Sequence, residues 1–192
     1  FLRLNHRITQ VPHQKDALVS TGWDLGVNDE TAIWFCQRIG REYHLIDYYA
    51  NKDKGLDYYY GILMKKGYRY DKHILPHDIS VREIGNMGLS RFESFERLFG
   101  RGNAVICPRI PLADGINAAR KFLPQTWFDL EATEEGVDSL DSYTKVWNNK
   151  LGTFQDTPLH NYHSNAADAF RYLAIYMTMY EQIQTRQQAR AP

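Results

Sequence analysis

The sequence lacks an excess of charge of either sign. Lys and Arg total 23, Asp and Glu also total 23, and the formal net charge of the 192 residues is therefore zero. A protein without an overall basic field has to hold a nucleic acid through a local patch of cationic side chains. We therefore expect any binding of DNA by this chain alone to be weak and sensitive to salt.

Cysteine and long apolar runs are also scarce. Cys36 and Cys107 lie in separate strand-like runs without CxxC spacing, which predicts reduced core residues and not a disulfide or a zinc site. No run is apolar enough to span a membrane, and the chain does not open on a signal-peptide-like segment. No G-x-x-x-x-G-K-[ST] motif occurs, which excludes a phosphate-binding loop of the P-loop ATPase type.

What is present indicates one globular domain. Hydrophobic residues make up 43% and aromatic residues 14% of the chain, which is long enough to bury a substantial core. Residues 1–19 have no clear periodicity and are expected to form a linker or arm. The domain itself is expected over 20–181, and the Gln- and Arg-rich segment 182–192 is expected to be a flexible tail. Because the chain opens at Phe1, we expect it to be a piece of a longer protein.

The periodicity of apolar residues predicts an α/β fold. Three strands joined by short turns form an antiparallel meander, and two further strands alternate with helices. The predicted strands are 18–27, 31–40, 42–50, 72–78 and 104–109. Helical stripes follow at 56–64, 92–99, 112–123, 137–147 and 165–180. The expected architecture is a mixed five-stranded sheet, a three-strand meander plus two parallel strands, flanked by helices on both faces.

One carboxylate stands inside the first apolar strand. Asp24 follows Gly22-Trp23 in a run that otherwise reads as buried, and burying a carboxylate costs several kcal/mol unless a cation or strong donors compensate. Asp24 is therefore either structurally paired or held there to bind a metal. Gly26, two residues later, is expected to allow close approach of the backbone.

Two further carboxylates are expected near Asp24. Right-handed crossovers place the fourth strand beside the first, so that Asp78 comes to the same edge, and Asp168 lies near the start of the last helix, capped by Ser164. Three converging carboxylates favour divalent cations with oxygen ligands, Mg²⁺ or Mn²⁺. Two such ions would suit hydrolysis of a phosphodiester by water. On spacing alone, three ordinary structural aspartates explain the pattern as well.

Several segments resemble one known family. They are Gly22–Trp34, Leu75–Asp78 with Arg82-Glu83 and Ser90-Arg91, Asp114–Arg120, Gly136–Tyr143 and His163–Tyr172, which occur in order and cover most of residues 20–178. In these segments the chain resembles the C-terminal nuclease domain of the large terminase subunit of tailed bacteriophages, which has an RNase H-like fold of the integrase and resolvase superfamily. The last segment is the most specific.

The resemblance implies a function and a set of partners. Asp24, Asp78 and Asp168 match the metal-binding acids of the family, and the implied activity is endonucleolytic cutting of concatemeric double-stranded DNA during genome packaging, with low sequence specificity. The implied partners are double-stranded DNA, the terminase small subunit and the portal protein, in the cytoplasm of the host and not in the virion. The family also carries an N-terminal ATPase, and residues 1–19 are expected to be the stub that follows it. The isolated domain is expected to be monomeric.

Other polar residues are weaker candidates. His163 and His77 are candidates for a proton shuttle or a phosphate contact, and a metal-like pair of His160 with His163 is the less favoured interpretation. Glu30, with its neighbour Asp29, is an outer-shell candidate or a turn residue. Candidates for contacts to DNA phosphates are Arg82, Arg91, Arg109, Arg120, Lys121 and Lys145.

Two alternatives to a terminase nuclease stay open. A resolvase- or transposase-like nuclease of the same fold would prefer branched DNA to linear duplex. A non-catalytic DNA-binding or motor-docking module would tolerate the loss of Asp24. No Ser, Tyr or Cys is placed as a nucleophile, so in a nuclease of this kind water attacks directly.

Overall fold

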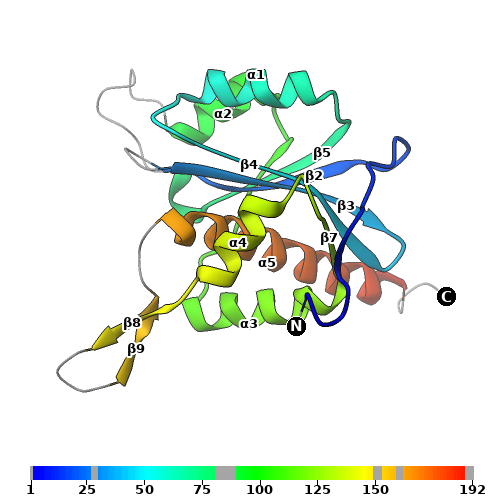
Figure 1. Cartoon of the computed structure of the whole chain (residues 1–192). Coiled ribbons are helices and arrows are strands. Elements are labelled where there is room, and N and C mark those ends of the chain that lie inside the picture. Colours follow the sequence, from blue (N-terminus) through cyan, green and yellow to red (C-terminus); the bar gives the residue numbers. More distant parts are fainter. Residues whose placement is uncertain (1, 27–29, 81–89, 149–152, 159–161, 189–192) are drawn as a thin grey trace.

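The fold is described by a computed structural model that covers residues 2–26, 30–80, 90–148, 153–158 and 162–188. Within these ranges, side chains are described except at 145–148, 153–158, 162 and 180–188. Arg82, Asp29 and His160 lie outside the described residues, as does the side chain of Lys145. Figure 1 shows a central sheet with helices above and below it.

The sheet has seven strands, two more than the sequence predicted, in the order β1-β7-β4-β3-β2-β5-β6. The five predicted strands are all present and adjacent, as the meander β2–β3–β4 with β5 beside β2 and β6 beside β5. β5 runs parallel to β2, which confirms the crossover that the sequence predicted. The bounds of β2, β3, β4, β5 and β6 are, in this order, Val19–Asp24, Glu30–Ile39, Glu42–Lys52, Tyr70–Leu75 and Ala104–Ile106.

The two additional strands extend the sheet beyond β4. β7, Thr126–Asp129, runs parallel to β4, and β1, Ile8–Thr9, runs parallel to β7. Both are short, so neither carries enough alternation to be distinguished from a loop in the sequence. Part of the segment expected as an arm thus belongs to the sheet, and Val11 is buried at 5% exposure.

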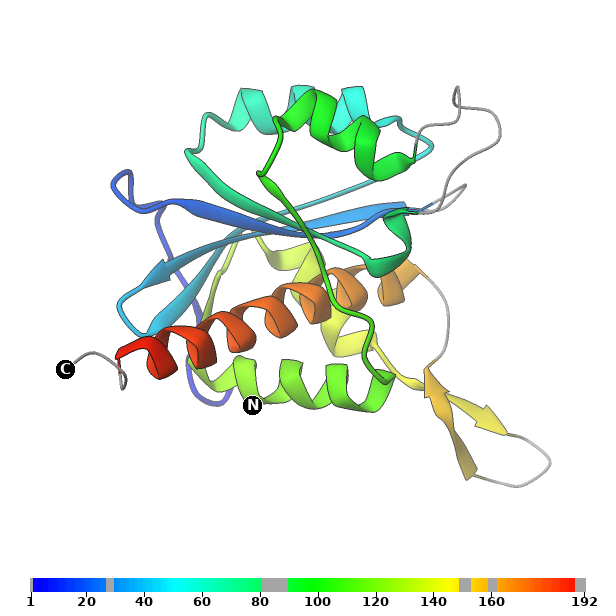
Figure 2. The same cartoon turned by 180° about the vertical axis from the view of Figure 1, so that it is seen from behind.

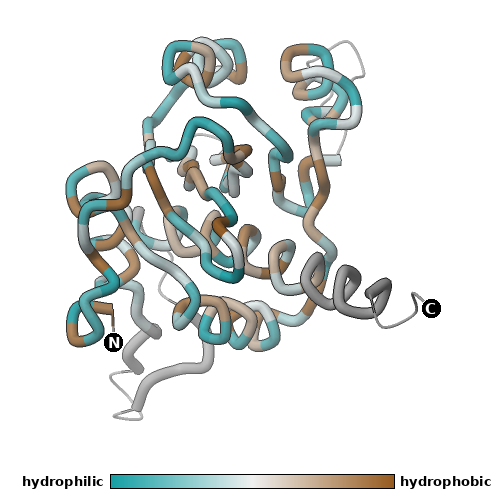
Figure 3. Tube along the Cα trace, turned by 90° about the vertical axis from the view of Figure 1, so that its right-hand side faces the viewer, coloured by the Kyte–Doolittle hydropathy of each residue, from teal (hydrophilic) through white to brown (hydrophobic). Residues whose placement is uncertain are grey.

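Helices cover the two faces of the sheet unequally. Two of them, α1 and α2, lie on one face, while α3, α4 and α5 lie on the other (Figures 1 and 2). Their bounds are Leu56–Lys66, Arg91–Phe99, Leu112–Phe122, Glu134–Ser142 and Tyr162–Gln188. A short 3-10 helix η1, His77–Ser80, follows β5, and another, η2, Leu123–Gln125, follows α3. Coloured by hydropathy, the helices on both sides of the sheet show hydrophobic residues interspersed with hydrophilic ones (Figure 3).

The structure corrects two helix boundaries. α4 ends at Ser142, and Val146 and Trp147 lie in strand β8, Lys145–Asn148, which pairs with β9, Thr153–Pro158, as a separate two-stranded sheet. Valine and tryptophan favour strands, but their spacing from Val137 also suited a helix. This hairpin projects from the body of the domain (Figures 1 and 2).

The last helix is longer than predicted at both ends. α5 begins at Tyr162, so Ser164 lies inside the helix and is not its N-cap, and Asp168 lies in the second turn. Proximity to the helix N-terminus therefore favours the charge of Asp168 less than the sequence suggested. At the other end the helix reaches Gln188, within the segment 182–192 that was expected to form a tail.

Glycine sets the distance between α5 and the sheet. A Cβ atom added to Gly22 in β2 would lie 2.6 Å from Cβ of Leu173 and 2.7 Å from the carbonyl oxygen of Ala169, both in α5. Only a residue without a side chain allows this approach. The close-approach residue that the structure identifies is thus Gly22, two positions before Asp24, whereas the sequence suggested Gly26.

Both cysteines are free and buried, as the sequence predicted. Burial raises the pKa of each thiol; that of Cys107 is raised to about 11, although nearby Arg171 opposes the shift. The thiols are therefore protonated core groups. No helix among the described residues is long and apolar enough to cross a membrane.

Candidate active site

Asp24 is the last residue of β2 and faces α5. Side chains alternate between the faces of a strand. Trp23 is fully buried against Phe95 and Phe99 of α2, whereas Gly22 lies against α5. Asp24 has the same parity as Gly22 and therefore points to the face that α5 covers. Its side chain is half-buried, unlike the buried residues that precede it.

Asp78 reaches the same edge of the sheet from β5. Gly22 pairs with Ile74 in the parallel register of β2 and β5, so the two strands end side by side. Asp78 follows the end of β5 within η1 and is exposed to solvent. No hydrogen bond or ion pair joins Asp78 to another described residue.

Asp168 comes from α5 and is held by an arginine one turn away. Nη2 and Nε of Arg171 donate to Oδ1 of Asp168 at 2.9 and 3.2 Å. Both donors reach the same carboxylate oxygen, and no described residue donates to Oδ2. The Arg171 side chain is only 12% exposed, so this ion pair is shielded from water more than the surface pairs of the domain.

The charges of all three carboxylates reach one group, the hydroxyl of Tyr172. Burial raises the pKa of the Tyr172 hydroxyl, Arg171 opposes the rise, and the charges of Asp24, Asp168 and Asp78 raise that pKa further. Tyr172 follows Asp168 by four residues, and residues four apart share a face of a helix. The sequence-predicted acids, from β2, η1 and α5, are thus all close enough to act on a single phenol.

The sequence did not single out two neighbours of the acids, Arg171 and Tyr172, or a buried residue of the same helix, Asn165. The first two follow Asp168 by three and four residues, which is a signal that helical spacing offers. Asn165 precedes Asp168 by three residues, is 3% exposed, and its Nδ2 has no hydrogen-bond partner. An orphaned buried donor is rare and calls for an acceptor that the protein itself does not supply.

These groups suit a divalent cation by their chemistry. Carboxylate oxygens are the ligands that Mg²⁺ and Mn²⁺ prefer, and the Asp78 carboxylate and Oδ2 of Asp168 are not engaged by described residues. As the side chains stand, however, the described residues contain no group of three or more His, Cys, Asp or Glu that could hold a metal ion. Closer approach would therefore require rotation of side chains, which the exposed position of Asp78 permits.

The histidine candidates differ in their surroundings. The ring of His77 lies 6.4 Å from that of Tyr172, beside the acids, and is half-buried. His163 lies in the first turn of α5, and its Nδ1 is 3.4 Å from Oγ of Ser139 in α4. His77 is thus the candidate histidine that lies against Tyr172.

The basic candidates are spread over the domain. Arg91 donates to the carbonyl oxygens of Leu25 and Gly26 at 3.3 and 3.4 Å, and so connects α2 to the segment that follows Asp24. Arg109 is exposed after β6, and Arg120 and Lys121 are exposed on α3. Their contacts with DNA stay predictions. Glu30 begins β3, opposite Lys52 of β4.

Comparison with protein-family models and with curated proteins gives no match. Solved structures do match. The nuclease domain of the P22 large terminase aligns with a TM-score of 0.59 at 14% identity, covering 90% of this chain and 89% of that domain. This chain has the fold of the large-terminase nuclease domains. The nuclease domain of the bacteriophage SPP1 large terminase, solved with bound Mn, aligns with a TM-score of 0.58 at 15% identity over 81% of this chain and 84% of that one.

The same fold occurs within longer large-terminase chains. A large terminase from a thermophilic bacteriophage aligns with a TM-score of 0.62 at 17% identity, covering 88% of this chain. This chain spans only 42% of the length of that protein. The mixed α/β, RNase H-like architecture expected from the sequence is therefore confirmed, and the large-terminase nuclease fold is the framework in which the three acids are placed.

Proposed function

We propose that this chain is a metal-dependent endonuclease domain that cleaves double-stranded DNA during viral genome packaging. The single observation that carries the proposal is the convergence of Asp24, Asp78 and Asp168 on Tyr172. The acids come from three separate elements, β2, η1 and α5, and the fold is shared with nuclease domains that were solved with Mn, Mg or Co bound.

Asp24, Asp78 and Asp168 would hold two divalent cations, Mg²⁺ or Mn²⁺. Bound cations of this kind lower the pKa of water and stabilise the leaving oxygen of a phosphodiester. Arg171 fixes the rotamer of Asp168 through Oδ1 and leaves Oδ2 directed elsewhere. Asp24, at the end of β2, would be the ligand shared between the ions.

Other residues have roles in binding substrate and moving protons. Nδ2 of Asn165 is a donor without an acceptor, and it can donate to an oxygen of the substrate or of an ordered water. His77, beside Tyr172, is placed to exchange a proton with solvent. The exposed Arg109 and Lys121 would contact DNA phosphates without reading sequence, which fits cleavage with low sequence specificity.

The packaging context adds partners to the proposal. By their resemblance to this chain, the large terminases suggest concatemeric viral DNA as the substrate, the terminase small subunit and the portal protein as partners, and the host cytoplasm as the location. A domain without net charge would rely on such partners to bring DNA to the acids, because its own field attracts DNA weakly.

Plasmid nicking in the presence of Mn²⁺ tests the proposal. Asp24→Ala, Asp78→Ala and Asp168→Ala should each lower the nicking rate at least about a hundredfold, because each removes a metal ligand. Asp71→Ala is the matched control, since Asp71 is exposed at the opposite end of β5 and should keep full activity. Circular dichroism and thermal unfolding establish that each variant is folded. Full activity of Asp24→Ala would refute the assignment.

One observation favours a non-catalytic module as the second candidate. Asp168 is already ion-paired with Arg171, and the described residues contain no ready-made group of three metal ligands. A module of this kind would bind DNA equally well with or without Asp24 and would nick no plasmid in Mn²⁺. A resolvase-like activity would instead appear as preferential cutting of a four-way junction over linear duplex of the same sequence.

A further inference from the structure

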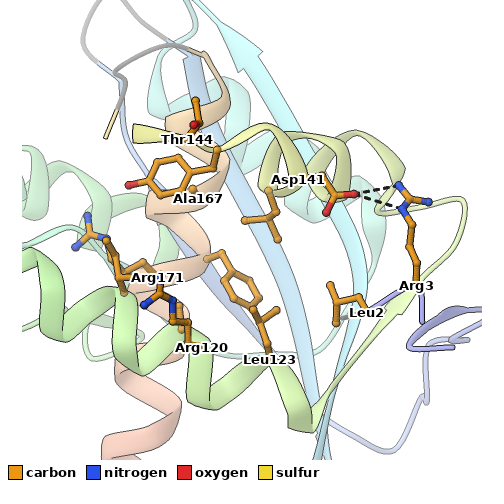
Figure 4. A pocket seen from close by; sticks show the side chains of 13 residues that line it. Leu2, Arg3, Arg120, Leu123, Asp141, Thr144, Ala167 and Arg171 are labelled. Atoms are coloured by element: carbon orange, nitrogen blue, oxygen red, sulfur yellow. Dashed lines mark hydrogen bonds and ion pairs between the residues drawn. The ribbon is translucent and has the colours of Figure 1, made fainter. Parts of the chain in front are cut away.

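A pocket of about 460 Å³ lies between α3, α4 and α5, beside Arg171. Its walls include the apolar side chains of Ile116, Leu123, Leu140 and Phe170 (Figure 4). This volume falls within the range of about 300 to 1,000 Å³ that is typical of small-molecule sites. The pocket is not filled by the protein, and it adjoins the acid cluster at Arg171, the partner of Asp168.

The pocket contains three arginines, and two of them already have counter-charges. Arg3 pairs with Asp138 and Asp141 at 3.3 Å at one end of the pocket. Arg171 pairs with Asp168 at 2.9 Å. No ion pair links the third, Arg120, to any described carboxylate. Arg120 is thus the arginine of this pocket that has no ion-pair partner among the described residues, and it can pair with the carboxylate of a ligand.

The guanidinium of Arg120 lies at the same end of the pocket as a second guanidinium, that of Arg171. Figure 4 shows Arg120 and Arg171 at the same end of the pocket, opposite the ion pair of Arg3 with Asp141. Arg171 turns Nε and Nη2 toward Asp168, while its Nη1 lies against α3, 3.4 Å from the position that a Cβ of Gly115 would occupy. A carboxylate placed at this end could accept from both arginines, and guanidinium groups match carboxylates in geometry.

We propose that this pocket binds a small organic acid that has one carboxylate and an apolar, two-ring-sized body. The carboxylate pairs with Arg120 and with the outer edge of Arg171, and the body lies against Ile116, Leu140 and Phe170. The apolar walls disfavour a DNA phosphate in this position, because a polar sugar would lose its hydration there. The inference does not depend on the proposed nuclease activity, since it concerns binding in the absence of metal.

Calorimetric titration with 2-naphthoate, and with its neutral amide 2-naphthamide, tests this inference without Mn²⁺. We expect 2-naphthoate to bind with one-to-one stoichiometry and a dissociation constant below about 1 mM, and the amide to bind at least about tenfold more weakly. Arg120→Gln should reduce the affinity for 2-naphthoate to that for the amide. Lys121→Gln is the matched control, because it removes the same charge from the next residue of α3, which does not line the pocket.

A second variant tests the space inside the pocket independently of the charge of Arg120. Ala119→Phe places a ring in the pocket from the partly exposed face of α3 and should abolish binding of both compounds, while thermal unfolding shows that the fold is kept. Three results would overturn the proposal: no saturable binding of 2-naphthoate, equal effects of Arg120→Gln and Lys121→Gln, or unchanged binding in Ala119→Phe. Displacement of 2-naphthoate by a short DNA duplex with equal loss in both charge variants would likewise identify a phosphate surface instead.

Discussion

The two faces of the central sheet are built differently. On the face under α1 and α2, the rings of Trp23, Phe95 and Phe99 pack together, with Phe95 and Phe99 stacked at 4.0 Å between ring centroids. The face under α5 has an aromatic core of its own, in which Trp34 packs with Phe128 and Phe170, and beside this core lie the charged side chains of Asp168 and Arg171. Strand β2 contributes to both faces, with Trp23 on one and Asp24 on the other. The comparison suggests that both faces supply stability and that the face under α5 also carries the candidate catalytic groups.

The polar groups around Trp23, on the aromatic face under α1 and α2, are paired internally. Nε1 of Trp23 donates to Oγ1 of Thr21 at 2.6 Å, and that hydroxyl lies 2.6 Å from Nδ1 of His73. Buried polar atoms without a partner occur on both faces, among them Nε1 of Trp127 on this face and Nδ2 of Asn165 on α5. An unpaired buried group costs stability, and that of Asn165 lies in the helix that carries Asp168, where a ligand could supply its partner.

The largest effect is expected from Phe95→Ala on the aromatic face. Removing this fully buried ring leaves a cavity beside Trp23 and should lower the free energy of unfolding by about 3–5 kcal/mol. Urea denaturation measures this loss. At a temperature where the variant is folded, its nicking rate in Mn²⁺ should match that of the wild type. A selective loss of nicking in the folded variant would contradict the prediction that residues of this face affect stability and not catalysis.

A somewhat smaller effect is expected from the protonation of His73. Burial lowers the pKa of His73 from 6.5 to about 4, so the unfolded chain binds this proton more readily than the folded one. The contribution of neutral His73 to the free energy of unfolding is full above pH 6.5. It falls as the pH drops toward 4, by up to about 3 kcal/mol. Urea denaturation at a series of pH values measures it. The His73→Gln variant should lack this component, and parallel curves for the two proteins would contradict the prediction.

The smallest effect on stability is expected from Asp78→Asn on the charged face. Because Asp78 is exposed and has no described partner, its replacement should change the free energy of unfolding by less than about 0.5 kcal/mol. Mn²⁺ should nevertheless raise the melting temperature of the wild type and not that of Asp78→Asn, since a ligand stabilises only the protein that binds it. Asp71→Asn, on the same strand, should keep the response to Mn²⁺. An equal response in all three proteins would place the metal elsewhere.

The sequence predicted the elements that have a long apolar period and missed those that depend on tertiary contacts. The meander and the stripes of α1, α2, α3 and α5 were recognisable because each buries one regular face. β1 and β7 have two and four residues, and only the pairing of β7 with β4 and of β1 with β7 makes them strands. The β8–β9 hairpin was missed because its apolar residues also fitted a continuation of α4.

The candidate site was predictable in its acids and not in the groups around them. Asp24 was conspicuous as a charge inside an apolar strand, and the crossover rule brought Asp78 beside it. The pairing of Arg171 with Asp168 was available from their spacing but could not be distinguished from any other surface pair on a helix. Whether Nδ2 of Asn165 has an acceptor depends on the tertiary surroundings of its side chain, which the sequence does not describe.

The contact at Gly22 sets the distance between β2 and α5. Because the backbones of β2 and α5 touch there, the separation between the strand that carries Asp24 and the helix that carries Asp168 cannot shrink further, and any side chain at position 22 would widen it. A single methyl group at this position would therefore act as a wedge, displacing two ligand-bearing backbones from each other without altering either acid. The spacing between the ligands of the proposed metal site is thus set by a residue that contributes no ligand to it.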